Sequence, residues 1–350
     1  MRKWIAAILS CGMIISLTAC TDTANSSETG QTSETEIGVT SAPDNTTSES
    51  ITLRIGFSTK KSDPRVQVSE TFKAMVEEQT QGRIAVELYA DGELGSDAEL
   101  IKGVINGEVD MTVSSAGNFA DYVPKVGASA LPFLFSSFEE AWEFVDGETE
   151  RQIEEELTEY NIKALAHFDN GFRCVTTSES AGPINSVSDM AGIKIRTPQN
   201  QMVMETLSAL GAYPYVMDFT KLYDALKNGE FDAQENPVPI IYNSRLYEVQ
   251  SCLAVTNHSY DMMLFVIRND IWESLTAQEQ QILQSAALEA QKQDRELIQT
   301  QTMQYIDMLK EKGMTITYPD LDEFREATVG VYDYFAESYG EELMEQLKNY

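Results

Sequence analysis

The sequence is poor in histidine and cysteine, with two histidines and four cysteines in 350 residues. Neither His167 nor His258 belongs to a Cys/His cluster, which excludes a structural zinc site. Neither histidine lies in a recognisable nucleophile motif, and Gly-x-Ser-x-Gly does not occur. We therefore expect no metal, no cofactor and no catalytic triad, so the chain is not predicted to be an enzyme.

Basic residues are also scarce, with 25 Lys and Arg against 56 Asp and Glu and a net charge of −31. A nucleic-acid-binding surface needs a basic face, so this class of function is excluded. The hydrophobic content of 42% is typical of a globular protein. The length is more than one hydrophobic core usually supports and suits two domains of ordinary size.

The N-terminus has the features of an export signal. Arg2 and Lys3 precede an apolar run over 4–17, which is short for a membrane span. The phrase Leu17-Thr-Ala-Cys20 resembles a bacterial lipobox and predicts a signal peptide over 1–19 and lipidation of Cys20. Its removal takes away two basic residues and no acidic one, which changes the net charge from −31 to −33. The predicted location is the outer face of the cell membrane, or facing the periplasm.

The segment 21–50 contains fourteen Ser or Thr, six acidic residues and no basic residue. Such a composition cannot bury enough apolar surface to fold, so 20–50 is predicted to be a lipidated Cys20 followed by a disordered tether. In the folded part, Cys174 and Cys252 could form a disulfide in an exported protein or remain as two buried free thiols. The spacing alone leaves both open.

Hydrophobic patterning predicts alternating strands and helices, and hence a mainly parallel sheet with right-handed crossovers. The phrase Asn-Gly-Glu-x-Asp ends a helix at 106–110 and again at 228–232, which fits two lobes of similar build. A capping box at Thr276 begins a helix with no Gly or Pro before Gly313. At 1.5 Å per residue it would span about 50 Å, so it must kink or lie across both lobes. The predicted strands are 51–57, 84–89, 109–113, 163–168, 173–176, 193–196 and 213–217, and the main predicted helices are 64–81, 97–106, 139–160, 199–210 and 219–227.

Arg196 ends a predicted short strand, and Pro198 stops the strand two residues later. Ligands of open α/β sheets bind outside the carboxyl ends of the strands. A guanidinium there forms a planar fork that suits a carboxylate or a phosphate. The alternative is an ordinary strand-end arginine in a surface ion pair.

From about Leu53 to Glu326 the chain resembles the solute receptors of tripartite ATP-independent periplasmic (TRAP) transporters, the DctP family. Several phrases occur in the order typical of that family. They are Gln81-Gly-Arg-Ile, Gly92-Glu-Leu-Gly, Gly107-Glu-Val-Asp-Met, Leu131-Pro-Phe-Leu-Phe, Ser188-Asp-Met-Ala-Gly-Ile-Lys-Ile-Arg196, Leu222-Tyr-Asp-Ala-Leu-Lys-Asn-Gly, Asp232-Ala-Gln-Glu-Asn-Pro237, Tyr247-Glu-Val-Gln and Thr256-Asn-His258.

The resemblance implies a two-lobed α/β fold of the periplasmic-binding-protein kind (type II-like), with a ligand cleft between the lobes and a long helix bridging both. The expected first lobe is 51–171 plus about 260–298, and the second is 172–259 plus about 299–350. The implied function is an extracytoplasmic receptor, monomeric, that delivers a small organic acid to a membrane permease. The alternatives are a receptor for a sensor kinase and an exported hydrolase.

By the same resemblance, Arg196 forms an ion pair with the carboxylate of the ligand, and Arg173 is a second basic contact. Asn236 donates or accepts a hydrogen bond from the opposite wall, and Phe219 packs against the ligand. The expected contacts also include Ser58, Ser115 and Asn118. Each of these residues also has a purely structural interpretation, such as a turn Asn or a core Phe.

Three departures from the family pattern bear on the ligand. Ala233 stands where family members often have Gly, and Thr220-Lys221 stands where they often have Ser-Glu. Sialic-acid receptors carry charged residues in the segment that here reads Ser114-Ser-Ala-Gly-Asn118, which weakens a sialic-acid assignment. A monocarboxylate sugar acid and a C4-dicarboxylate both remain open.

Overall fold

The computed structural model describes residues 50–348 and Tyr350. The predicted signal peptide, the lipidation site Cys20 and all but the last residue of the predicted tether lie outside the described residues. Within the described part of the chain, no helix is long and apolar enough to cross a membrane.

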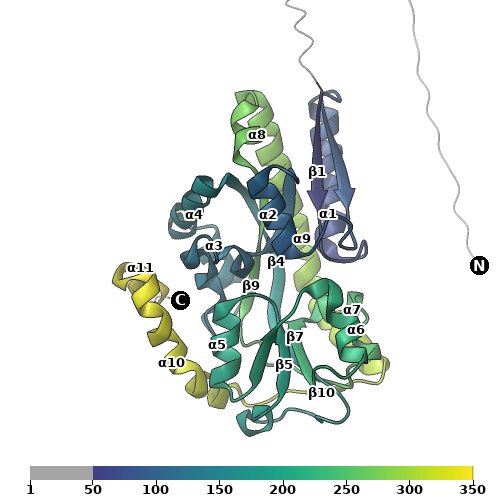
Figure 1. Cartoon of the computed structure of the whole chain (residues 1–350), viewed down its shortest axis with the longest axis vertical. Helices are drawn as coiled ribbons and strands as arrows, with labels where there is room; N and C mark the ends of the chain where they lie inside the picture. Colours follow the sequence, from purple (N-terminus) through teal and green to yellow (C-terminus); the bar gives the residue numbers. More distant parts are fainter. Residues whose placement is uncertain (1–49, 349) are drawn as a thin grey trace, which may run out of the picture. The chain divides into compact units, whose positions relative to one another are not determined.

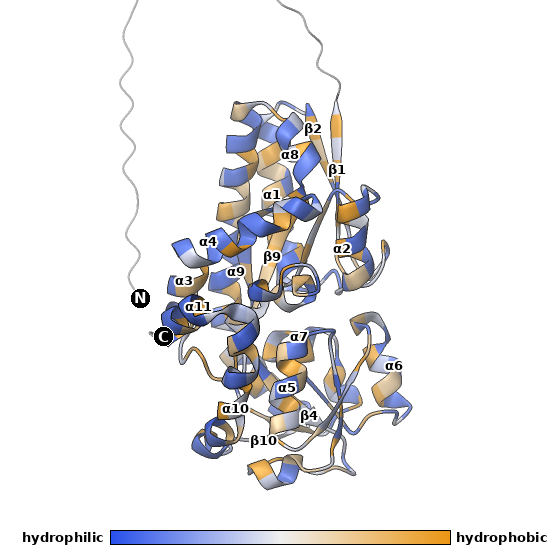
Figure 2. Cartoon of the chain, turned by 60° about the vertical axis from the view of Figure 1, so that its left-hand side comes forward, coloured by the Kyte–Doolittle hydropathy of each residue, from blue (hydrophilic) through white to orange (hydrophobic). Residues whose placement is uncertain are grey.

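The first lobe is built around three parallel strands, with β1 between β2 and β3. Helix α1 begins at Pro64, where the Asp63 side chain accepts a hydrogen bond from the Arg65 amide. Buried aliphatic side chains fill both faces of the sheet, and in Figure 2 the helices alternate hydrophilic and hydrophobic residues, as expected for helices that bury one face. The elements are β1 (Ile51–Gly56), α1 (Pro64–Gln79), β2 (Ile84–Tyr89), α2 (Asp97–Asn106), β3 (Met111–Ser115), the 3-10 helices η1 (Ala116–Phe119) and η2 (Pro124–Ala130), α3 (Phe138–Val145), α4 (Glu148–Glu155) and η3 (Glu156–Tyr160).

The second lobe repeats this plan around the parallel strands β6, β5 and β7. Helices α6 and α7 contribute to one apolar cluster of this lobe and α5 to the other. The elements are η4 (Val187–Met190), β5 (Lys194–Thr197), α5 (Gln201–Ala209), β6 (Tyr213–Val216), η5 (Phe219–Lys221), α6 (Leu222–Lys227), β7 (Ala233–Pro237), α7 (Val238–Asn243), η6 (Leu246–Glu248) and β8 (Cys252–Ala254). Two lobes of α/β build are therefore confirmed.

A single strand, β4 (Ile162–Thr177), belongs to both lobes. Its first part pairs antiparallel with β9 (Tyr260–Arg268), and its last part pairs antiparallel with β7 and β8 (Figure 1). The sequence predicted two separate strands here, with Gly171 in the gap. Instead the chain passes through Gly171 at φ 106° beside a register shift, a conformation that glycine adopts without a steric penalty.

Helix α9 (Ala277–Glu311) is continuous over 35 residues and bridges the lobes. Its capping box is formed, since Thr276 Oγ1 accepts from the Glu279 amide at 3.3 Å and Glu279 Oε2 accepts from the Thr276 amide at 2.9 Å. Its first half packs on the first lobe, where it contacts α1 and β4, and Ile306 and Leu309 belong to a cluster of the second lobe. Helix α8 (Asn269–Ser274) precedes it.

The C-terminal segment differs from the predicted division, which assigned about 299–350 to the second lobe. It comprises β10 (Thr315–Thr317), α10 (Leu321–Tyr339) and α11 (Glu341–Leu347). Phe324 packs in a cluster of the second lobe, but Val331 and the apolar residues that follow belong to a cluster of the first lobe. The segment therefore crosses back, because apolar side chains of α10 and α11 belong to the same cluster as those of η2 and α4. The other boundaries of the division stay a prediction.

Cys174 and Cys252 are both buried free thiols. Of the two predicted alternatives, the structure therefore has the free thiols and not the disulfide. Cys174 is opposite Asn236 in the β4–β7 ladder, whereas Cys252 is opposite Thr177 in the β4–β8 ladder. Burial raises the pKa of the Cys174 thiol to about 11, which keeps it protonated and unreactive.

Candidate ligand-binding site

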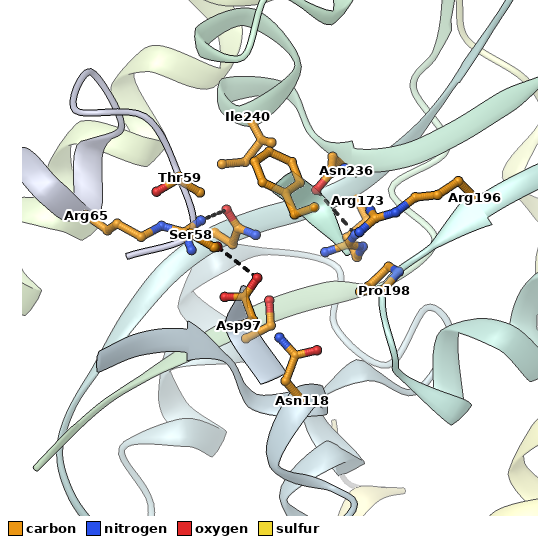
Figure 3. A pocket seen from close by; sticks show the side chains of 13 residues that line it. Ser58, Thr59, Arg65, Asp97, Asn118, Arg173, Arg196, Pro198, Asn236 and Ile240 are labelled. Carbon is orange, nitrogen blue, oxygen red and sulfur yellow. Dashed lines mark hydrogen bonds between the residues drawn. The ribbon is translucent and has the colours of Figure 1, made fainter. Parts of the chain in front are cut away.

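A cavity of about 40 Å³ lies between the lobes, where the carboxyl ends of β1, β3, β5 and β7 converge. All seven residues that the sequence singled out as ligand contacts line it. The cavity is also lined by residues that the sequence did not single out. The full lining is Ser58, Thr59, Arg65, Asp97, Ser115, Asn118, Asn170, Arg173, Arg196, Pro198, Phe219, Asn236 and Ile240 (Figure 3).

Arg196 is a buried cation without a carboxylate partner among the described residues. Its side chain extends from β5 toward the centre of the cavity (Figure 3), and the residue is 1% exposed. Nε and Nη2 both donate to the Met217 carbonyl, at 2.9 and 2.6 Å, which fixes the guanidinium while leaving its charge unpaired. Burial lowers the pKa of Arg196 to about 10, although the carboxylate of Glu235 raises it. The group is therefore charged at neutral pH and forms no ion pair with any residue that the structure describes.

Phe219 flanks this guanidinium, with the ring centroid 5.9 Å from Arg196 Cζ. The distance is within the range of a cation–π contact. The ring therefore shields one side of the charge from water, which strengthens any interaction that the guanidinium makes inside the cavity.

Arg173 also lines the cavity, but its charge is already compensated. Its Nε and Nη2 contact the Glu235 carboxylate, Nη2 to Oε1 at 2.8 Å, and its Nη1 contacts Asp261. Burial opposes ionisation of the guanidinium, yet these two carboxylates outweigh it and raise the pKa of Arg173. Likewise, although burial opposes it, Arg173 and His258 lower the pKa of Glu235 to about 2. Arg173 is thus part of a buried ion cluster on β4, β7 and β9.

The first-lobe wall of the cavity carries oxygen acceptors and amides. Asp97, the first residue of α2, accepts hydrogen bonds from Ser58 Oγ at 2.8 Å and Ser114 Oγ at 3.0 Å. Ser115 Oγ donates to Asp261 at 3.1 Å. The side-chain amide of Asn118 makes no hydrogen bond with any described residue, which leaves it free to bind a ligand.

Asn170 on β4 links helix α1 to strand β9 beside the cavity. Its Oδ1 accepts from Arg65 Nη2 at 2.9 Å and its Nδ2 donates to Asp261 at 2.7 Å. Asn236 on β7 donates to Gln234 at 2.6 Å and accepts from Arg173 Nη2 at 3.4 Å. Asn170 could have been found from its place in the sequence, since it lies three residues before the predicted contact Arg173. Asp97 could have been found as the first helical residue after a strand-and-turn, where polar side chains reach a cleft.

Among the charged side chains that line the cavity, the cations other than Arg196 are already paired, so one position suits an anion. Arg65 is paired with Asp63 at 2.9 Å, and Arg173 with two carboxylates. Asp97 presents a further carboxylate from the opposite wall. Arg196 is the cavity-lining cation that lacks an acidic partner in the described part of the chain, so the arrangement suits one carboxylate and repels a second placed near Asp97.

Two α/β lobes, crossover strands and an interlobe cavity with a buried unpaired arginine define a receptor for a small solute. The profile of the DctP family, described as bacterial extracellular solute-binding protein family 7, matches residues 55–338. The chain belongs to this family, whose members include the solute receptors of TRAP transporters and are receptors, not enzymes.

Three similar proteins are named for a ligand or have a structure with a ligand bound. The chain is 33% identical over 270 residues to the 2,3-diketo-L-gulonate-binding periplasmic protein YiaO of Escherichia coli, covering 77% of this chain and 81% of that protein. It is similar to the solute-binding protein of Polaromonas sp. JS666 bound to D-erythronate (30% identity, TM-score 0.82, 85% and 98% of the two chains). It is also similar to that of Roseobacter denitrificans with bound L-galactonate (29% identity, TM-score 0.80, 86% and 98%).

Proposed function

We propose that this chain is the receptor of a TRAP transporter for a small monocarboxylic hydroxy acid of the sugar-acid type. The observation that carries the proposal is the Arg196 guanidinium, buried and charged, without a carboxylate partner in the described residues. Burying a charge without a partner costs free energy, and the ligand carboxylate would supply the missing partner. A bidentate pair would also fix the orientation of the ligand.

The rest of the cavity favours hydroxyl groups over a second carboxylate. Asp97 accepts hydrogen bonds and would accept further ones from ligand hydroxyls, whereas it would repel a second ligand carboxylate. Asn118 and Ser115 add polar atoms to the same wall. Arg173 retains one N–H of Nη1 beyond the contact with Asp261, so it would donate to the ligand while its charge stays neutralised by Glu235 and Asp261. Asn236 and Phe219 would complete the opposite wall.

A thermal-shift screen with D-erythronate, L-galactonate, L-gulonate and succinate tests this function. We expect stabilisation by at least one sugar acid, because a ligand that binds only the folded state adds about 2.7 kcal/mol of stability at 100 times its Kd. Succinate should stabilise the protein much less. NMR of the recovered acid should show it unchanged, as expected for a receptor. Stabilisation by succinate alone would contradict the monocarboxylate assignment, and turnover of the acid would indicate a hydrolase.

We also propose that the receptor is monomeric and is anchored through a lipid on Cys20. The phrase Leu17-Thr-Ala-Cys20 after an apolar run supports the lipid anchor. In a bacterial host, the full chain should fractionate with membranes, and Cys20→Ser should release it or leave it unprocessed. Cys11→Ser is the matched control, because Cys11 would be removed with the signal peptide. A Cys20→Ser protein with unchanged processing and membrane attachment would contradict the anchor.

A further inference from the structure

The two lobes touch each other on both sides of the cavity, and on each side the first lobe contributes a glycine. Gly117 precedes the cavity residue Asn118 and faces Asn200 of the second lobe. Gly92, in the turn after β2, faces Thr220, which follows the cavity residue Phe219. The two interlobe contacts therefore adjoin the candidate site directly.

The contact at Gly117 leaves no room for a side chain. A Cβ added to Gly117 would lie 2.5 Å from Asn200 Cγ and 3.2 Å from Asn200 Cβ, and real Cβ atoms essentially never approach another heavy atom within 3.0 Å. Asn200 cannot simply turn away, because its Oδ1 caps helix α5 by accepting from the Val203 amide at 3.3 Å. The residue is also buried.

The contact at Gly92 is also close, although less so, and a hydrogen bond adds to the contact at Gly117. A Cβ on Gly92 would lie 2.9 Å from Thr220 Cγ2. Next to Asn200, Gln199 Nε2 donates to Asp121 Oδ2 of the first lobe at 2.5 Å. The cavity between these contacts measures about 40 Å³, whereas pockets for small molecules usually measure a few hundred. The lobes are therefore in close contact on both sides of the cavity, as expected for a closed form.

We propose that Gly92 and Gly117 are closure residues, whose missing side chains let the lobes meet on both sides of the bound acid. This inference rests on the proposed function. A side chain at Gly117 raises the free energy of the closed form and leaves the open form unaffected, since the atoms it would meet belong to Asn200 of the other lobe, whereas one at Gly92 would also strain the backbone. A ligand held by both lobes binds the closed form, so its apparent affinity falls by the same factor as the closed population.

Gly117→Ala is the sharper test, because Gly117 lies outside the left-handed region and alanine fits its backbone, whereas Gly92 has φ 72°. Calorimetry of the wild type with D-erythronate, L-galactonate and L-gulonate comes first and tests the proposed function by itself. The acid that binds is then used for the variants. We expect Gly117→Ala to bind it roughly ten- to a hundredfold more weakly, the effect of overpacking a tight contact. The melting temperature without the acid should stay unchanged.

Two further variants separate closure from a general packing defect. Gly127→Ala is the matched control, because a Cβ there would make only ordinary contacts, 3.5 Å from Ala120 Cβ and the Tyr339 hydroxyl. Asn200→Gly in the Gly117→Ala background removes the opposing side chain and should recover most of the lost affinity. Small-angle scattering at an acid concentration that saturates the wild type but not Gly117→Ala should show compaction in the wild type and the double variant, and less in Gly117→Ala. Equal affinity of Gly117→Ala and wild type, or no recovery in the double variant, would overturn the proposal.

Discussion

Arg196→Ala should weaken binding of the sugar acid by about 2–5 kcal/mol, because the ligand carboxylate would be desolvated without its partner. Arg196→Lys should also bind poorly, since an ammonium group keeps the charge but cannot form the bidentate fork. Calorimetry measures both. An affinity within about twofold of the wild type, less than ~0.4 kcal/mol, would show that Arg196 is not the carboxylate anchor.

Replacing Arg196 should affect the stability of the acid-free protein very differently from binding. Arg196 is 1% exposed and has no acidic partner in the described residues, so its burial costs free energy that the ligand would restore. Arg196→Met keeps most of the volume and removes the unpaired charge. We expect it to abolish binding without lowering the melting temperature. Arg325→Lys, an exposed arginine outside the cavity, is the matched control for both measurements.

This contrast between binding and stability explains why the second lobe contains an arginine where an apolar residue would be more stable. Binding sites often retain groups that are unfavourable in the free protein, because their cost is recovered when the ligand binds. In this site the Met217 carbonyl and the Phe219 ring hold the Arg196 guanidinium in place before binding. A preorganised fork loses less conformational entropy on forming the pair than a mobile one.

The sequence predicted the positions of the cavity residues better than their electrostatic state. Arg196 could be located because ligands bind at the carboxyl ends of strands, and its strand end is visible in the sequence, whereas Asn236 was indicated only by the family resemblance. The pairing of Arg173 could not be predicted. Its partners Glu235 and Asp261 lie 62 and 88 residues away, and no local pattern distinguishes them among 56 acidic residues.

For the fold as well, features with local sequence signals could be predicted, and features that depend on long-range contacts could not. The long helix was predicted because a capping box and the absence of Gly and Pro are local signals, and α9 is continuous as a result. The passage of β4 through Gly171 was missed, since glycine in a strand pattern reads as a break. The return of α10 and α11 to the first lobe was also missed. Amphipathic helices bury an apolar face, but the sequence does not specify which neighbour covers it.

Glu235→Gln should lower the free energy of unfolding by about 3 kcal/mol at pH 7, because it leaves part of the buried charge of Arg173 uncompensated. We expect the low end of the range for a broken buried pair, since Asp261 remains as a partner. Glutamine keeps the volume of the side chain, so no cavity adds to the effect. The measurement is guanidinium unfolding of both proteins.

The difference in unfolding free energy between wild type and Glu235→Gln should depend on pH, and this dependence identifies its cause. The pKa of Glu235 is about 2 in the folded protein, below its ordinary value of 4.5. A carboxyl group with a lowered pKa stabilises the fold above its unfolded pKa, and this stabilisation is lost as the pH falls toward 2. The gap between wild type and Glu235→Gln should therefore be full at pH 7 and should narrow between about pH 4.5 and 2. Glu248→Gln removes a partly exposed partner of Arg245 and should cause a much smaller change, because solvent screens that pair. A gap that stays constant down to pH 2 would mean that glutamine disturbs the packing of β7 and not the ion cluster.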